Sequence, residues 1–154
     1  MLGGILGYYY CDDDMLLENT NNSGTITGRT AVGGIVGMGG GVSMSGPPSA
    51  GIGCVSVSRA ENSGAVSGSG NSVGGIIGVG TSSKSIDNVL NTGTVQGRDQ
   101  VGGIIGNSVE GIVENALNLG QVIAADGNAQ YCGGIVGWGP GAIVSDKADL
   151  CDDR

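Results

Sequence analysis

Short apolar runs alternate with glycine and asparagine along the whole chain. The most regular run is a hexad made of an apolar residue, two glycines, isoleucine, an aliphatic residue and glycine, and it begins at Leu2, Val32, Val73, Val101 and Cys132. The apolar runs contain β-branched residues and last only four to six positions, which is too short for helices. The pattern therefore predicts an all-β chain of short strands.

The hexads recur at intervals of 30, 41, 28 and 31 residues. Most of these units are shorter than a propeller blade of about 40–45 residues. One unit fits one coil of a parallel β-helix in which three strands are joined by turns. We therefore expect one repeat domain over residues 1–154, a β-solenoid of five short coils, with units that begin near residues 2, 32, 73, 101 and 132.

Stacking the units places identical residues above one another, about 4.8 Å apart. An isoleucine column would fill a dry interior, and an asparagine column would allow side-chain amides to hydrogen-bond from coil to coil, as in other ladders of identical residues. Glycine after asparagine suits a turn with positive φ. The predicted structural ladder consists of Ile5, Ile35, Ile76, Ile104, Ile135, Asn22, Asn62, Asn91, Asn118, Gly24, Gly64, Gly93 and Gly120.

The second unit is longer than the others because it carries an insertion rich in glycine, serine and proline, which predicts a loop over residues 38–52. Loops on a rigid scaffold commonly carry recognition, and methionine adapts to irregular contact surfaces. The candidate interaction residues of this loop are Met38, Met44, Pro47 and Pro48.

Composition and charge exclude several classes of function. The chain has no histidine, so it cannot build a Ser-His or Cys-His catalytic site or a His-ligated zinc site. Six Lys and Arg stand against fourteen Asp and Glu, and the net charge of −8 argues against nucleic acid as a partner. The acidic runs after Cys11 and Cys151 lack the alternating ligands of a calcium loop. We assign no catalytic, cofactor-binding or metal-binding residue, and no membrane-spanning segment.

The last unit holds three less regular residues. Tyr131 and Trp138 flank its hexad, where they either stack on a sugar or pack at the end of the solenoid. Cys132 stands in a valine column and is expected to be a small buried apolar residue. The alternative is a disulfide with Cys151, which belongs to the same coil.

The hexad followed by Asn-x-x-Asn-[Ser/Thr]-Gly-x-Val resembles the GLUG repeat, and the resemblance covers nearly the whole chain in four full units and one partial unit. Arg59, in the first asparagine column, and Cys132 depart from the pattern. The resemblance implies a bacterial surface or secreted protein, either adhesin-like or of the immunoglobulin A-cleaving peptidase type. Because the first hexad begins without a polar cap, we expect the chain to be a segment of a longer protein.

We therefore expect a non-catalytic extracellular module that acts as a stalk or as an adhesion surface. Its partner would be a host protein, a matrix protein or a glycan. The alternative function is an accessory, non-catalytic region of a large secreted hydrolase or peptidase. An HExxH motif elsewhere in the longer protein would favour this alternative, whereas further repeats with a wall anchor would favour the adhesin.

Overall fold

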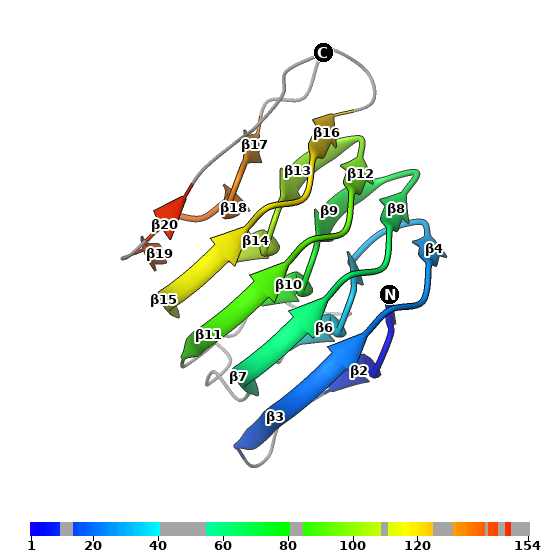
Figure 1. Ribbon diagram of the computed structural model, residues 1–154. Helices are drawn as coiled ribbons and strands as arrows, with labels where there is room; N and C mark the ends of the chain where they lie inside the picture. Colours follow the sequence, from blue (N-terminus) through cyan, green and yellow to red (C-terminus); the bar gives the residue numbers. More distant parts are fainter. Residues whose placement is uncertain are drawn as a thin grey trace, which may run out of the picture.

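The protein is a stack of parallel β-coils, seen in a computed structural model that describes residues 1–9, 14–40, 55–80, 85–108, 111–124, 131–140, 142–144 and 147–148. All regular structure in the described residues is β, and equivalent strands of successive coils lie side by side (Figure 1). The fold is therefore an all-β parallel solenoid, as the repeat predicts. The described residues contain no helix that is long and apolar enough to cross a membrane.

The strands form four sheets, and every strand pairing within them is parallel. The first sheet contains β1 (Leu2–Gly3), β5 (Val32–Gly33), β9 (Asn71–Gly74), β13 (Asp99–Gly102) and β17 (Cys132–Gly133). The second contains β2 (Leu6–Tyr9), β6 (Val36–Gly39), β10 (Ile77–Gly80), β14 (Ile105–Ser108) and β18 (Val136–Trp138). The third contains β3 (Met15–Asn22), β7 (Val55–Asn62), β11 (Ile86–Asn91), β15 (Gly111–Asn118), β19 (Ala142–Val144) and β20 (Lys147–Ala148). The fourth contains β4 (Ile26–Gly28), β8 (Val66–Gly68), β12 (Val95–Gly97) and β16 (Val122–Ala124).

Each of the first four coils has four strands, so the expectation of three strands per coil is wrong. The difference lies in the hexad, which forms two short strands instead of one. In the second coil the strand β5 ends at Gly33, and β6 begins at Val36. The chain reverses so tightly between them that a Cβ on Gly33 would lie 2.0 Å from the carbonyl oxygen of Val36. We call this pair of strands the hexad arch.

The hexad arch divides the interior into two apolar clusters. Val32, on one strand of the arch, packs in a valine cluster with Val66 of the fourth sheet. Val36, on the other strand, packs in a larger cluster with Val57 of the third sheet. Because the arch carries glycine at three of its six positions, its two strands can approach each other without side chains between them.

The isoleucine of the hexad lies at the tip of the arch. Ile35, Ile76 and Ile104 are fully buried in the larger cluster, and Ile135 is 3% exposed. Ile5 differs, because it lies in the first coil and is 50% exposed. The backbone amides follow the same stack, since each isoleucine N–H donates to the carbonyl oxygen of the isoleucine in the next coil at 2.9–3.0 Å.

Candidate binding surface

A ladder of asparagine amides runs along the inside of the third sheet. Nδ2 of Asn22 donates to Oδ1 of Asn62 at 2.7 Å, and the same bond at 2.8 Å joins Asn62 to Asn91 and Asn91 to Asn118. The second hydrogen of each Nδ2 goes to the carbonyl oxygen of the glycine two residues later, at 2.8–2.9 Å. The last three asparagines are at most 1% exposed, and in Asn62 and Asn91 both amide hydrogens have a protein acceptor.

The asparagine ladder touches the tip of the hexad arch. A Cβ on Gly75 would lie 2.5 Å from Cγ of Asn91, and a Cβ on Gly103 would lie 2.3 Å from Cγ of Asn118. Both contacts are shorter than a real Cβ atom tolerates. The second glycine of the hexad is therefore needed so that the arch can reach the ladder, and this contact joins the two most regular parts of the repeat.

The glycines that follow the asparagine ladder serve close stacking, which corrects the reason expected for them. Positive φ angles occur in the described glycines at Gly40 and Gly111, and not at Gly24, Gly64, Gly93 or Gly120. A Cβ on Gly93 would instead lie 2.0 Å from the carbonyl oxygen of Gly64 in the neighbouring coil. Any larger residue there would force adjacent turns apart.

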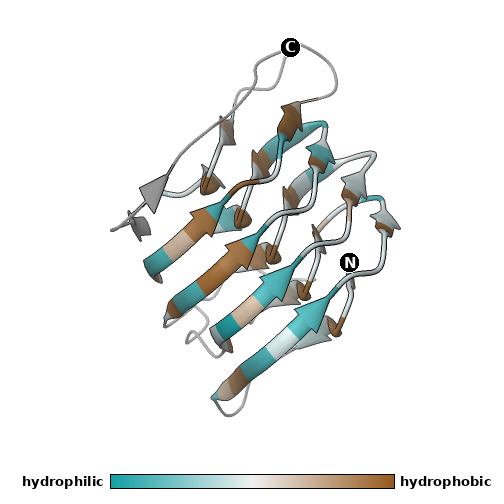
Figure 2. Cartoon of the chain, viewed as in Figure 1, coloured by the Kyte–Doolittle hydropathy of each residue, from teal (hydrophilic) through white to brown (hydrophobic). Residues whose placement is uncertain are grey.

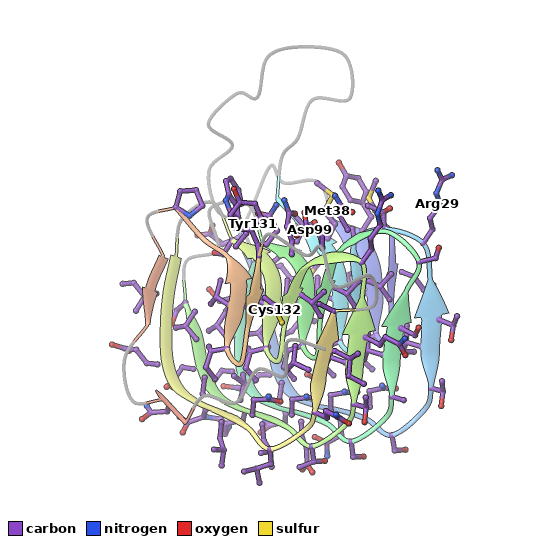
Figure 3. The ribbon with its side chains drawn as sticks, turned by 90° about the horizontal axis from the view of Figure 1, so that it is seen from above. Arg29, Met38, Asp99, Tyr131 and Cys132 are labelled. Carbon is purple, nitrogen blue, oxygen red and sulfur yellow. The ribbon has the colours of Figure 1, made fainter. Side chains whose placement is uncertain are left out.

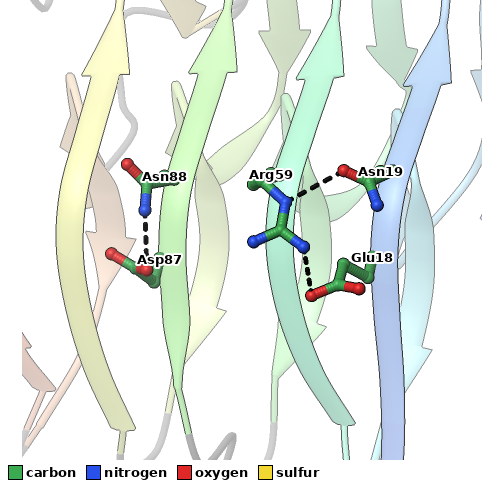
Figure 4. A network of polar contacts seen from close by, with 5 residues as sticks. All are labelled: Glu18, Asn19, Arg59, Asp87 and Asn88. Atoms are coloured by element: carbon green, nitrogen blue, oxygen red, sulfur yellow. Dashed lines mark hydrogen bonds and ion pairs between the residues drawn. The ribbon is translucent and has the colours of Figure 1, made fainter.

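A second asparagine column lies on the outer face of the same long strands and behaves differently. Asn19, Arg59, Asn88 and Asn115 all have left-handed φ angles, between 48° and 54°. Arg59 bonds through Nε to Oδ1 of Asn19 at 2.9 Å and forms an ion pair with Glu18 (Figure 4). In the next coils Asp87 accepts Nδ2 of both Asn88 and Asn115, at 2.8 Å each. The bonds of this column therefore change from coil to coil.

The hexad arch brings together the residues that flank it, seven positions apart in sequence. We call these pairs the flanking row: Met1 and Tyr8, Ala31 and Met38, Ser72 and Val79, Gln100 and Asn107, Tyr131 and Trp138. The pairs follow one another up one edge of the stack, where Figure 3 shows Met38, Asp99 and Tyr131. Unlike the interior columns, this row carries a different pair in every coil.

The fourth and fifth coils give the flanking row its polar and aromatic end. Oε1 of Gln100 accepts the hydroxyl of Ser72 at 2.7 Å and Nδ2 of Asn107 at 2.9 Å. Tyr131 and Trp138 meet edge to face, with ring centroids 6.2 Å apart and an interplanar angle of 65°. Tyr131 is 39% exposed, and Trp138 is half-buried.

Asp99 links the coil that carries Gln100 to the coil that carries Tyr131. Its Oδ1 accepts the backbone N–H of Gln100 at 2.9 Å and that of Tyr131, one coil further on, at 3.1 Å. One carboxylate oxygen thus ties two adjacent coils at the point where the flanking row enters the first sheet. This anchoring reduces the freedom of the backbone that carries Tyr131.

Two other features were considered in the sequence, the interaction loop over residues 38–52 and the acidic runs near the two ends. Met38 is not part of a loop, because it lies in β6 and is 9% exposed. Met44, Pro47 and Pro48 lie outside the described residues, as do Asp12, Asp13 and the acidic run after Cys151. Among the described residues no group of three His, Cys, Asp or Glu side chains is placed to hold a metal ion.

Cys132 pairs with Val101 of the neighbouring coil and packs against the valine cluster, as its place in the column suggests. It is nevertheless disulfide-bonded, so the expectation of a simple apolar residue is wrong. The other three cysteines, Cys11, Cys54 and Cys151, all lie outside the described residues. A valine position fixes the direction of the side chain but says nothing about which thiol comes close to it.

The outer face of the third sheet also changes along the stack. The arrowheads of β3 and β7 are teal in Figure 2, whereas those of β11 and β15 are brown. Leu90 and Leu117 are paired neighbours on these later strands, and Leu117 and Leu119 are 38% and 63% exposed. The sequence pattern indicated the Tyr131 and Trp138 pair beside the last hexad, but neither the rest of the flanking row nor this patch was predicted. The signal for the flanking row was present, since the residues next to each hexad differ from unit to unit.

The chain was compared with known proteins. Neither a family model, nor a curated protein, nor a solved structure matches it.

Proposed function

We propose that the chain is a non-catalytic module of an extracellular bacterial protein, of the GLUG-repeat type, that acts as a stalk and as an adhesion surface. The observation that carries the proposal is the division between a constant interior and a varied exterior. The buried isoleucine and asparagine columns repeat in coil after coil, while the outer face of the third sheet differs from coil to coil. The flanking row also varies, and it reaches the surface at Tyr8 and Tyr131, which are 40% and 39% exposed. Such a body keeps its shape over its length and presents side chains that are free to diverge.

Two further features support this proposal. The buried amides of the inner asparagine column are bonded to one another from coil to coil, which suits a rigid rod more than a body that must open and close around a substrate. The disulfide at Cys132 suits an oxidising location, because structural disulfides are typical of secreted and surface proteins and rare in the cytosol.

The test is to display the chain on bacterial cells that do not themselves adhere. Retained cells are counted on surfaces coated with mucin, with a host matrix protein or with albumin. A tag placed beyond the outer end of the chain reports through antibody-coated beads whether the chain raises it above the cell surface. Greater retention on mucin or matrix protein than on albumin supports adhesion, and bead binding that depends on the chain supports a stalk.

The control is the same display with Asn91→Asp, a substitution expected to break the stack. If the intact chain neither retains cells nor makes the tag accessible, the proposed function is wrong. The same conclusion follows if the Asn91→Asp chain performs as well as the intact one in both assays.

A further inference from the structure

We propose that the flanking row of the fourth and fifth coils, Gln100, Asn107, Tyr131 and Trp138, is a binding site for a neutral sugar residue of a glycan. This inference deepens the proposed function, on which it rests, by naming the class of partner. The site combines an aromatic corner with a pair of amides one coil away, which are the two kinds of group that a pyranose ring requires.

The aromatic corner suits the apolar side of a sugar. Tyr131 and Trp138 are inclined at 65° to each other, so they form a step and not a flat stack. A pyranose ring has a face of C–H groups that packs against an aromatic ring, while its edge carries hydroxyl groups. With Tyr131 39% exposed and its ring held against Trp138, the step combines an accessible surface with a defined position.

The neighbouring coil supplies hydrogen-bonding groups that are already oriented. Ser72 and Asn107 both donate to Oε1 of Gln100, which fixes the direction of the Gln100 amide. Among the described residues nothing accepts a hydrogen bond from Nε2 of Gln100 or from Nε1 of Trp138. These two donors stand beside the aromatic step and suit hydroxyl acceptors.

Asn107 orients the site and does not itself meet a ligand. Its Nδ2 donates to Oε1 of Gln100 at 2.9 Å, while its Oδ1 is buried away from solvent. Asn107 pairs in register with Trp138, one coil away. The site therefore offers two donors, Nε2 of Gln100 and Nε1 of Trp138, together with an aromatic surface, which suits the hydroxyl groups and the C–H face of a sugar.

The charge of the chain favours neutral over anionic sugars. Its net charge is −8. Sialylated and sulfated glycans are repelled by this charge, so we expect the ligand to be uncharged.

The experiment uses the single tryptophan of the chain, Trp138, as its probe. The purified chain is titrated with lactose, N-acetyllactosamine, maltose, cellobiose and 3′-sialyllactose while tryptophan fluorescence is recorded. We expect a saturable change with at least one of the neutral sugars and a response at least tenfold weaker in affinity with sialyllactose. No saturable change with any neutral sugar, or equal affinity for sialyllactose and lactose, would overturn the proposal.

Variants separate this site from general surface effects. Tyr131→Ala and Gln100→Ala should each weaken the affinity at least tenfold, whereas Tyr131→Phe should retain most of it. The control is Tyr8→Ala, because Tyr8 is the exposed tyrosine of the flanking row in the first coil, in the column of Trp138, and is 40% exposed. Its affinity should change less than twofold. Circular dichroism melts verify that each variant keeps the stack.

The outcome is distinguishable from that of the proposed function. Displayed cells carrying Tyr131→Ala that still adhere to a matrix protein, together with a failed sugar titration, would leave the adhesion module standing and remove the glycan site. Affinity for the neutral sugar that is unchanged in both Tyr131→Ala and Gln100→Ala would place the sugar elsewhere on the chain and would also overturn the site.

Discussion

The two asparagine columns of the long strands lie three positions apart and look alike in sequence, but they have different structural roles. In the inner column, Asn62, Asn91 and Asn118 repeat one arrangement, in which each amide bonds to the next and to its own turn. In the outer column every residue has the same left-handed backbone, but the side chains form hydrogen bonds to different kinds of partner from coil to coil. The inner column is selected for its amide, and the outer column for its backbone.

This difference explains where the repeat can vary. An amide accepts from the asparagine on one side, donates to the asparagine on the other and keeps a second hydrogen for the carbonyl oxygen of its own turn, whereas a hydroxyl has one hydrogen only. The inner column therefore admits no other kind of side chain without the loss of a hydrogen bond. Asparagine is one of the few residues that adopts a left-handed φ at low cost, which accounts for its frequency in the outer column. Arg59 nevertheless stands there, at a φ of 51°, because its side chain points to solvent and finds Asn19 and Glu18.

The difference between the two columns is tested most directly by making the same change, from asparagine to aspartate, in both columns of one strand. In β11, Asn91→Asp removes the donors to the carbonyl oxygen of Gly93 and to Oδ1 of Asn118 and leaves a carboxylate buried against them. An unpaired buried charge of this kind costs about 3–5 kcal/mol. We expect a loss of this size in the free energy of unfolding, measured by urea denaturation, or no cooperative transition at all.

The matched variant is Asn88→Asp, three residues earlier in the same strand. Asn88 is exposed, and within the described part of the chain its amide bonds to the neighbouring Asp87. A new charge in that position is screened by water, so the free energy of unfolding should change by no more than about 1 kcal/mol. Equal midpoints for the two variants would show that the inner ladder does not stabilise the stack.

The sequence predicts much of this architecture. The features that it does not predict have one physical cause in common. The repeat spacing predicts the coils, and the isoleucine columns predict the interior at Ile35, Ile76 and Ile104. The inward fold of the hexad depends on contacts such as that of Gly75 with Asn91, between residues 16 positions apart, and no local pattern reports it. The same fold creates the flanking row, so both were missed together.

The two asparagine columns could have been told apart by one residue. Arg59 interrupts only the outer column, and a buried ladder of amides does not accommodate a guanidinium group without a partner. Arg59 therefore marks the outer column as the one that does not form the hydrogen-bonded ladder. The disulfide of Cys132 has no comparable signal, because bond formation depends on the path of the chain that carries the second cysteine.

A second test concerns the glycine that faces the inner column. In Gly75→Ala the new Cβ would lie 2.1 Å from the carbonyl oxygen of Gly103 and 2.5 Å from Cγ of Asn91, and backbone cannot yield as a flexible side chain would. We expect a loss at or above the upper end of the roughly 1–3 kcal/mol seen for overpacked interiors. Thermal and urea melts measure it.

The control for this test has the opposite expected sign. Gly7, in the first hexad, has nothing within 4 Å of a Cβ atom built on it, and its φ is not positive. Gly7→Ala should stabilise the chain by about 0.4–1 kcal/mol, because alanine restricts the unfolded state. A loss for Gly7→Ala as large as that for Gly75→Ala would mean that glycine is needed in the hexad for its flexibility and not for close packing.

The smallest expected effect comes from restoring asparagine to the outer column. Arg59→Asn removes an ion pair whose side chains are 54% and 41% exposed, and such pairs contribute about 0–1 kcal/mol. Asparagine also tolerates the left-handed φ better than arginine does, which offsets part of the loss. The net change in the free energy of unfolding should therefore stay within about 1 kcal/mol. At about 1 M salt, where screening extends over only about 3 Å, the ion pair contributes less, and the difference between the two chains should shift in favour of the variant. A loss of several kcal/mol that is insensitive to salt would show that Arg59 is part of the structural ladder, and that the outer column is as strictly specified as the inner one.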